Sequence, residues 1–387
     1  MRALLDLAGA PDRTLRVVLI AGTKGKGSTA AFTAAILHAG GARAGLFTSP
    51  HLQTYRERVR IDGAMLAESR FDRAIDDLRP IVARLRRAHP AAGEPTTFEL
   101  TLLLAMRAFA ERGCAIAIVE VGLGGRIDAT NALDPVISAI TPVSYDHTAI
   151  LGRTLAAIAL EKAGIVRRGR PALVAEQRPA AARAIARVCR AAGADLRVVA
   201  PLGVHADLGL TGDHQRQNAA LATAIAAELG FDRAAIARGL RSTRWPARFE
   251  RVRGRPAIVL DGAHNGASAA ALARALRHER GGRRLVLVLG INRDKDARAV
   301  LRPLVRLAAS VIVTRSASPR AADPAAVARI AARGPRSAVL TAPDVNSALA
   351  AARAAAGPDG LVGVAGSLAL AAEARTALGL VPSERWW

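Results

Sequence analysis

The sequence predicts an α/β protein of two domains, each built on a mostly parallel sheet covered by helices. The chain has 387 residues, of which 51% are hydrophobic, and this is enough for two cores. Short apolar runs alternate with longer helical patterns along most of its length. The alternation starts again after Trp245-Pro246, so we expect one domain at 1–246 and a second at 247–387.

The elements of both domains can be placed from these patterns. The apolar run 15–22 predicts a strand that leads through a glycine-rich loop into a helical pattern ending at Gly40. In the first domain we expect further strands at 115–122 and 135–141, and helices at 154–166, 179–193 and 213–230. In the second domain we expect five strands, at 257–265, 284–290, 310–315, 337–342 and 361–367, with helices between them.

The composition limits the class of protein. The chain has a formal charge of +23, which suits polyanionic substrates or arginine dispersed over helix surfaces. No block of five or six cations occurs and aromatic residues are 3%, so we do not expect nucleic-acid binding. Cys114 and Cys189 are too few for a disulfide framework. No apolar stretch reaches the roughly 18 residues of a membrane span and the start does not resemble a signal peptide, so we expect a cytoplasmic protein.

Lysine is rare and unevenly placed. The chain has 55 lysine and arginine residues, but lysine occurs only at Lys24, Lys26, Lys162 and Lys295. Two of these lie in the loop GTKGKGS (22–28), which connects a predicted strand to a predicted helix. Glycines let backbone N–H groups approach phosphate oxygens, and the helix N-terminus adds a positive dipole. The loop is shorter than the usual P-loop pattern, and an ordinary glycine-rich turn is the alternative.

Within this loop the two lysines have different expected roles. The compact ammonium of Lys26, on a flexible stem, can fold back over the loop toward a terminal phosphate, which a planar guanidinium does less well. Lys24 is expected to be a second cation that faces either phosphate or solvent.

Longer motifs follow the loop in order along the chain. They are LFTSPHL (46–52), RERVRIDG (56–63), TTFELT (96–101), VEVGLGGRIDATN (119–131), ITPVSYDHTAILGRTLAAIALEKAGIV (140–166), GDHQRQNAALA (212–222), WPARFE (245–250), LDGAHN (260–265) and DKD (294–296). Together they resemble the folylpolyglutamate synthase and dihydrofolate synthase family of Mur-type ATP-dependent amide ligases. The resemblance implies a P-loop Mur-ligase-type central domain followed by a Rossmann-like C-terminal domain. The segment 365–375 resembles the family's ending only loosely.

The resemblance implies a ligase that uses ATP and Mg²⁺ and forms an acyl phosphate. It would add L-glutamate to 7,8-dihydropteroate, to the γ-carboxylate of folyl-glutamates, or to both, and release ADP and phosphate. Such a reaction develops negative charge on phosphoryl oxygens, so it needs cations rather than a protein nucleophile. We therefore expect small molecules as partners (dihydropteroate or folates, L-glutamate and ATP), no nucleic acid, no membrane, and a monomer.

The resemblance also implies roles for individual residues. The nucleotide contacts would be Gly25, Lys26, Gly27, Ser28, Asn218, Arg248 and Asp261. The magnesium ligands would be Ser49, Glu120 and His147. The pterin contacts would be Thr96, Thr97, Phe98, Glu99, Ile127, Asp128 and Ala129. Because Arg248 and Asp261 lie beyond the expected boundary, ATP would bridge the two domains in a cleft that excludes water.

Two further residues are catalytic candidates with alternatives. The family's counterpart of Lys162 is carbamylated, a reaction that needs a primary amine and would turn this cation into an anion near the metal. The alternative is a lysine that reaches the surface or pairs with Glu161. His264 is expected either to contact the incoming glutamate or to position its loop.

Three other functions remain open from the sequence. A folylpolyglutamate synthase without dihydrofolate synthase activity is one. A Mur-type ligase acting on a cell-wall precursor is another, although GLGGRIDATN argues against it. A P-loop ATPase that binds nucleic acid is the third, and it would show ATP turnover that responds to DNA or RNA but not to glutamate.

Overall fold

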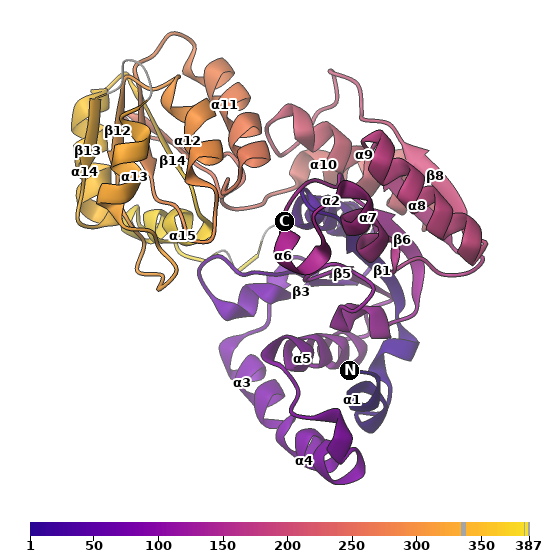
Figure 1. Ribbon diagram of the computed structural model, residues 1–387. Helices are drawn as coiled ribbons and strands as arrows, with labels where there is room; N and C mark the ends of the chain where they lie inside the picture. The colour runs from indigo at the N-terminus through magenta and orange to yellow at the C-terminus, as the bar shows by residue number, and fades with distance from the viewer. Residues whose placement is uncertain (334–337, 383, 386–387) are drawn as a thin grey trace.

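The computed structural model describes residues 1–333, 338–382 and 384–385, and it contains two α/β lobes (Figure 1). The first is built on an eight-stranded sheet with the order β4-β3-β2-β5-β1-β6-β7-β8. Its strands are β1 (Arg16–Ala21), β2 (Ala44–Phe47), β3 (Val59–Ile61), β4 (Ala64–Met65), β5 (Ile116–Glu120), β6 (Pro135–Ile140), β7 (Pro171–Ala175) and β8 (Asp195–Val199). The pairings of β2 with β3 and of β3 with β4 are antiparallel, and the others are parallel. The mostly parallel sheet is confirmed.

The second lobe is built on a six-stranded sheet with the order β13-β12-β11-β14-β10-β9. Its strands are β9 (Glu250–Val252), β10 (Ala257–Leu260), β11 (Leu285–Leu289), β12 (Ser310–Val313), β13 (Ala338–Thr341) and β14 (Leu361–Ala365). Only β9 pairs antiparallel. All five predicted strands are present, although residue 337 of the fourth, like the Trp386-Trp387 end, lies outside the described residues.

Helices cover both faces of each sheet. In the first lobe they are α1 (Arg2–Leu7), α2 (Lys26–Ala39), α3 (Glu68–Asp76), α4 (Arg79–Ala88), α5 (Thr97–Glu111), α6 (Thr148–Leu151), α7 (Leu155–Ala163), α8 (Pro179–Ala192), α9 (Asp213–Glu228) and α10 (Arg233–Ser242). In the second they are α11 (Gly266–Arg280), α12 (Ala297–Val305), α13 (Pro324–Ala331), α14 (Val345–Ala356) and α15 (Leu368–Ala377).

Alternating side chains on the central strands build the separate cores. In β1, Val17 and Leu19 pack with α5 on one face, while Val18 and Ile20 pack with α2 and α9 on the other. In β11, Leu287 lies in the core under α11 and α12, and Val288 lies in the core under α14. Strands buried on both faces read as continuous apolar runs, which is why the sequence revealed them.

Two connections join the lobes. The first is the segment 243–249, between α10 and β9, and our proposed division between residues 246 and 247 falls within it. The second is the C-terminal segment after α15, which returns to the first lobe, where the Met65 amide donates to the Glu384 carbonyl at 2.9 Å. The described chain therefore runs between the lobes at two separate places.

Candidate active site

The phosphate-loop candidate connects β1 to α2 and is shaped by two glycines. Gly22 has a φ of +142°, and a Cβ there would lie 1.8 Å from Thr141 Oγ1. Gly25 precedes the first residue of α2 with a φ of +91°, and its Cβ would lie 2.0 Å from Asn218 Oδ1. Side chains at these positions would clash, so glycine is required for this turn to pack closely. The predicted nucleotide residue Asn218 therefore lies directly against the loop.

The loop is also held by the segment that follows β6. The Thr23 and Lys24 amides donate to the Pro142 carbonyl at 3.2 and 3.3 Å. The Thr23 hydroxyl donates to the Ser144 carbonyl and accepts from the Ser144 amide, both at 3.1 Å. These four bonds fix the backbone of the loop in front of the α2 N-terminus, where an anion is stabilised by the helix dipole.

All four lysines of the chain meet at this loop. The Lys162 ammonium donates to the Gly22 carbonyl at 2.8 Å, and Lys26 Nζ lies 3.3 Å from the same oxygen. Lys24 Nζ lies 3.0 Å from Asp146 Oδ2, and Lys295 Nζ lies 3.7 Å from Asp146 Oδ1. A site with four amines at one edge of a sheet is suited to a highly charged anion.

The structure decides between the alternatives for two lysines. Lys162 is 4% exposed, and Glu161 pairs with Arg126 at 2.8 Å, so Lys162 neither reaches the surface nor pairs with its neighbour. Lys24 does not extend into solvent, because it is paired with Asp146. Burial, reinforced by the positive charge of Lys26, lowers the pKa of Lys162 to about 7. A large fraction of its amine is therefore neutral at neutral pH.

Two of the three predicted metal ligands lie together. Glu120 ends β5 and is 6% exposed, and its Oε2 accepts from the Ser49 amide at 3.2 Å. Its Oε1 lies 3.9 Å from Lys26 Nζ, and burial raises the pKa of its carboxyl. Ser49 and Glu120 both line a cleft between the lobes. A buried carboxylate beside a serine hydroxyl suits a hard divalent cation such as Mg²⁺.

The third predicted ligand, His147, lies at the start of α6, beside Asp146. It adopts a left-handed conformation (φ 49°) at the start of α6, its side chain is half exposed, and its Nε2 lies 3.9 Å from Asp146 Oδ1. Among the described residues, no three His, Cys, Asp or Glu side chains form a metal-binding group. A metal at this cleft would be held by Ser49 and Glu120, with His147 at the start of α6 and Lys162 in α7.

The second lobe presents Arg248, Asp261 and His264 to the same region. Asp261 follows β10, and its two oxygens accept from the Phe249 and Ala263 amides, each at 2.8 Å. This carboxylate holds the connecting segment that carries Arg248, a residue of the cleft lining. Phe249 has a φ of 49°, which is uncommon for a bulky residue. The Asp261 bond therefore stabilises a strained turn at the crossing between the lobes.

His264 has a defined tautomer and charge. Its Nδ1 lies 2.8 Å from the Gly262 carbonyl, which can only accept, so Nδ1 carries the proton. Burial, followed by the nearby charge of Lys24, lowers its pKa to about 4. The imidazole is therefore neutral, and Nε2 is a hydrogen-bond acceptor.

The predicted pterin residues divide into two groups. Phe98 and Asp128 lie together against Gly122, whose Cβ would be 2.8 Å from the Phe98 ring and 3.1 Å from Asp128 Oδ2. Asp128 also accepts from the Leu123 amide at 2.8 Å and caps a short turn that begins at Ala129. Ile127 beside it is 69% exposed, an unusual state for an isoleucine.

The other group is engaged in capping helix α5. Thr96 and Glu99 form a capping box before its first residue, Thr97, and Glu99 Oε1 also lies 3.2 Å from the amino group of Met1. The local role of Thr96 and Glu99 is thus to place Phe98, whose ring meets Phe47 edge-on at 5.5 Å.

The sequence reasoning missed two residues that join the lobes at this site. Asp146 accepts bonds from both lobes, and its only sequence signal was its place in the motif YDHT. Arg375 is 3% exposed, and its guanidinium binds Gln53 Oε1 at 2.8 Å, a Glu250 carboxylate oxygen, and the Val381 carbonyl at 3.2 Å. Its signal was an arginine in the last turn of a mostly apolar helix.

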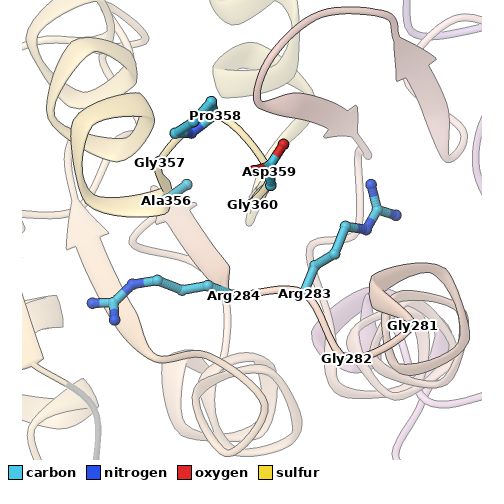
Figure 2. A pocket seen from close by; sticks show the side chains of 9 residues that line it. All are labelled: Gly281, Gly282, Arg283, Arg284, Ala356, Gly357, Pro358, Asp359 and Gly360. Atoms are coloured by element: carbon cyan, nitrogen blue, oxygen red, sulfur yellow. The ribbon is translucent and has the colours of Figure 1, made fainter.

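A separate hollow lies at the opposite edge of the second sheet (Figure 2). It is lined by Gly281, Gly282, Arg283, Arg284, Ala356, Gly357, Pro358, Asp359 and Gly360. These residues precede β11 and β14, so the hollow faces the amino ends of the parallel strands. Ligands of open α/β sheets bind at the carboxyl ends, where the lysines and Glu120 lie.

In the described part of the chain, no helix is long and apolar enough to span a membrane.

A phosphate loop on one α/β lobe, facing a second lobe across a shared cleft, defines a Mur-type ATP-dependent ligase. Residues 247–368 match the family "Mur ligase, glutamate ligase domain". The chain is 37% identical to the dihydrofolate synthase/folylpolyglutamate synthase of Mycobacterium tuberculosis, with 98% of this chain and 89% of that protein covered. The chain belongs to the folylpolyglutamate synthase/dihydrofolate synthase family.

Other relatives differ in length or in what they bind. A probable bifunctional folylpolyglutamate synthase/dihydropteroate synthase of Haloferax volcanii is 38% identical over 97% of this chain, which spans about half (48%) of that relative. Crystal structures of M. tuberculosis folylpolyglutamate synthase with ADP and AMPPCP superpose with a TM-score of 0.91, at 36% identity and 98% and 95% coverage of the two chains. The Yersinia pestis bifunctional enzyme with AMPPNP and a Mn ion has a TM-score of 0.87, at 30% identity and 98% and 92% coverage.

Proposed function

We propose that this protein is an ATP- and Mg²⁺-dependent ligase that joins L-glutamate to 7,8-dihydropteroate and to the γ-carboxylate of folyl-glutamates. The observation that carries the proposal is the meeting of all four lysines at a glycine-shaped loop, in front of a cleft lined by both lobes. Relatives that share the fold are named for this activity, and solved structures of such relatives hold ADP or ATP analogues, in one case with a Mn ion.

In the first step, ATP would phosphorylate the substrate carboxylate. Lys26 lies at the loop, near both the Gly22 carbonyl and Glu120, and would neutralise the transferring phosphoryl group. Gly25, Gly27 and Ser28 would cradle the phosphates at the α2 N-terminus, with Asn218 behind them. Arg248 and Asp261 would hold the nucleotide from the second lobe, so that ATP bridges the cleft. Water is excluded when the lobes close over the acyl phosphate.

In the second step, the glutamate amine would attack the acyl phosphate. His264 is placed to assist, because its neutral Nε2 accepts a hydrogen bond and can receive one from the incoming amine. The C–N bond forms as the C–O bond to phosphate breaks, and the amine proton leaves to solvent or to Nε2. This role for His264 adds to its place in the loop 261–265.

A Mg²⁺ ion would be held by Ser49 and Glu120, with His147 as the third ligand, and it would stabilise charge on the phosphoryl oxygens. Lys162 would be carbamylated. Its amine is buried and substantially neutral, and the neutral form is the one that adds CO₂. Conversion to a carbamate would replace a buried cation among three other lysines by an anion.

The pterin would bind between α5 and the 122–130 loop. Phe98 would stack on the ring system, and Asp128 would bond its polar edge while Ile127 covers it; Thr96, Thr97, Glu99 and Ala129 would frame the pocket. The resemblance of these segments to the dihydropteroate-binding segments of bifunctional family members supports dihydropteroate as a substrate in addition to reduced folates. We further propose that the enzyme acts as a monomer in the cytoplasm, with a division between its domains at residues 246 and 247.

Release of ADP tests the proposal directly. ADP is measured with dihydropteroate and with tetrahydrofolate, each with and without L-glutamate, and in parallel with single-stranded DNA and RNA. We expect glutamate-dependent release with both pterins. Turnover with reduced folates alone would assign a folylpolyglutamate synthase only. Release stimulated by nucleic acid and indifferent to glutamate would contradict the ligase.

A further inference from the structure

The carboxylate of Asp146 receives side chains from both lobes at the same time. It lies on the loop after β6, and its side chain is 14% exposed. Lys24 of the phosphate loop, Asn265 of the second lobe and Lys295 of the second lobe all contact it. We name these four residues the Asp146 clasp.

On the first-lobe side, the clasp completes the support of the phosphate loop. The backbone of residues 23 and 24 is already bonded to Pro142 and Ser144, and the pair of Lys24 Nζ with Asp146 Oδ2 at 3.0 Å extends these contacts to side chains. The other oxygen, Oδ1, accepts from the amide of His147 at 3.1 Å. Movement of Asp146 would therefore displace the loop and the backbone of His147 together.

On the second-lobe side, Asp146 contacts Asn265, whose side-chain orientation is fixed by its own helix. Asn265 caps α11, and its Oδ1 accepts from the Ser268 amide at 3.0 Å. Its amide nitrogen must then point away from the helix, and it donates to Asp146 Oδ2 at 3.2 Å. Asn265 follows His264 directly, so the bond ties the acceptor histidine to the phosphate loop.

Charge makes Asp146 necessary when the lobes are close. Lys24 and Lys295 come from opposite lobes, and both approach this one carboxylate, at 3.0 and 3.7 Å. Their side chains are 26% and 16% exposed, so solvent screens them incompletely. Without an anion between them the two ammonium groups would repel each other across the cleft.

We infer that Asp146 is a positioning residue that couples the approach of the second lobe to the conformation of the phosphate loop. It acts through Lys24 on one side and through Asn265 and Lys295 on the other. The charged and titratable groups around it are these two lysines, Lys162, His147, His264 beside Asn265, and Asp294, which pairs with Lys295 at 3.2 Å. The inference rests on the proposed function only where ligation is the measured quantity.

The test compares Asp146→Asn with a matched control. Asparagine keeps the size but removes the charge. Glu279→Gln makes the same change in a carboxylate that pairs with Arg251 at a distance of 2.8 Å. Glu279 does not line the cleft. We expect Asp146→Asn to lower kcat by at least about tenfold while the protein stays folded, with a lowered thermal midpoint because two ion pairs are lost, and Glu279→Gln to leave kcat unchanged. Hydrogen exchange of the α11 N-terminus should increase in Asp146→Asn alone.

A second variant separates positioning from a direct catalytic role. Lys24→Gln placed on Asp146→Asn removes the repulsion between the lobes, so it should recover much of the lost kcat and of the exchange protection. The inference is overturned if Asp146→Asn keeps kcat within about twofold of wild type, if protection is unchanged, or if the two substitutions multiply. If the wild type releases no ADP with any folate, the proposed function fails, and hydrogen exchange still tests the clasp.

Discussion

Replacing Lys162 by methionine should reverse its stability ranking against the wild type as the pH rises. The pKa of Lys162 falls from an ordinary value of 10.5 to about 7, chiefly through burial, so its protonated form destabilises the fold by about 5 kcal/mol. Its hydrogen bond to the Gly22 carbonyl, at 2.8 Å, offsets about 1–2 kcal/mol of this destabilisation. Methionine has a similar length and carries no charge. We therefore expect a gain of about 3 kcal/mol in Lys162→Met at pH 6.

The sign of the pH dependence follows from proton binding. Between pH 7 and 10.5 the unfolded chain keeps a proton on Lys162 that the folded protein has lost, so the wild type becomes more stable as the pH rises. Near pH 10 the neutral lysine keeps its hydrogen bond, and the variant should be slightly less stable. Urea unfolding of both proteins in CO₂-free buffer between pH 6 and 10 measures the difference. A constant difference across this range would refute the reasoning.

The same residue provides a test of carbamylation. With ¹³C-bicarbonate, the wild type should show a carbamate ¹³C signal that is absent in Lys162→Ala. That variant should lose activity by about a hundredfold or more, and acetate should restore part of it by occupying the vacated space. Lys162→Arg should be inactive without rescue, because a guanidinium adds no CO₂ and fills the space. Glu161→Gln serves as the neighbouring control. An active Lys162→Arg would contradict the carbamate.

The remaining predictions concern three other positions. Lys26→Ala should lower kcat by about 10³-fold or more in steady-state ADP release without unfolding, and wild-type turnover would exclude it from phosphate transfer. Gly22→Ala, whose Cβ would meet Thr141 at 1.8 Å, should destabilise by about 2–4 kcal/mol in urea unfolding; Gly41→Ala, with open space around it, should cost about 1 kcal/mol. Arg375→Met should lower the free energy of unfolding by about 3 kcal/mol in thermal unfolding, because it leaves Glu250 without its buried partner. The same substitution at the exposed Arg353 should be neutral. Equal effects of the two substitutions would contradict a role for Arg375 in joining the lobes.

Most of the fold was predictable because its signals are local. Continuous apolar runs such as 284–290 mark strands buried on both faces, and helical spacing marks α2, α7, α8 and α9. The strands β2 and β7 were not assigned, and the short strands β3, β4 and β9 and the edge strand β8 were not predicted. Strands of two or three residues, or strands exposed at an edge, carry too little apolar pattern to be distinguished from loops.

The site was predictable in part. Parallel strands end at the same edge, so the loops after β1, β5 and β6 bring the phosphate loop, Glu120 and the 141–147 segment together. His147 was expected to join Ser49 and Glu120 as a metal ligand, and this stays a prediction; the structure places its half-exposed ring 3.9 Å from Asp146. The left-handed backbone at His147 is a feature that sequence spacing does not reveal.

The sequence by itself determined the family, the central strands of both sheets, several of the helices and the chemistry of the phosphate loop, because each is written in contiguous residues. It also singled out the four lysines against a background of arginine. Only the tertiary structure decided that these lysines share one carbonyl and one carboxylate, and that Asp146 and Arg375 join the two lobes. Such contacts depend on how two separately folded sheets are oriented, and no periodicity within either sheet encodes that orientation.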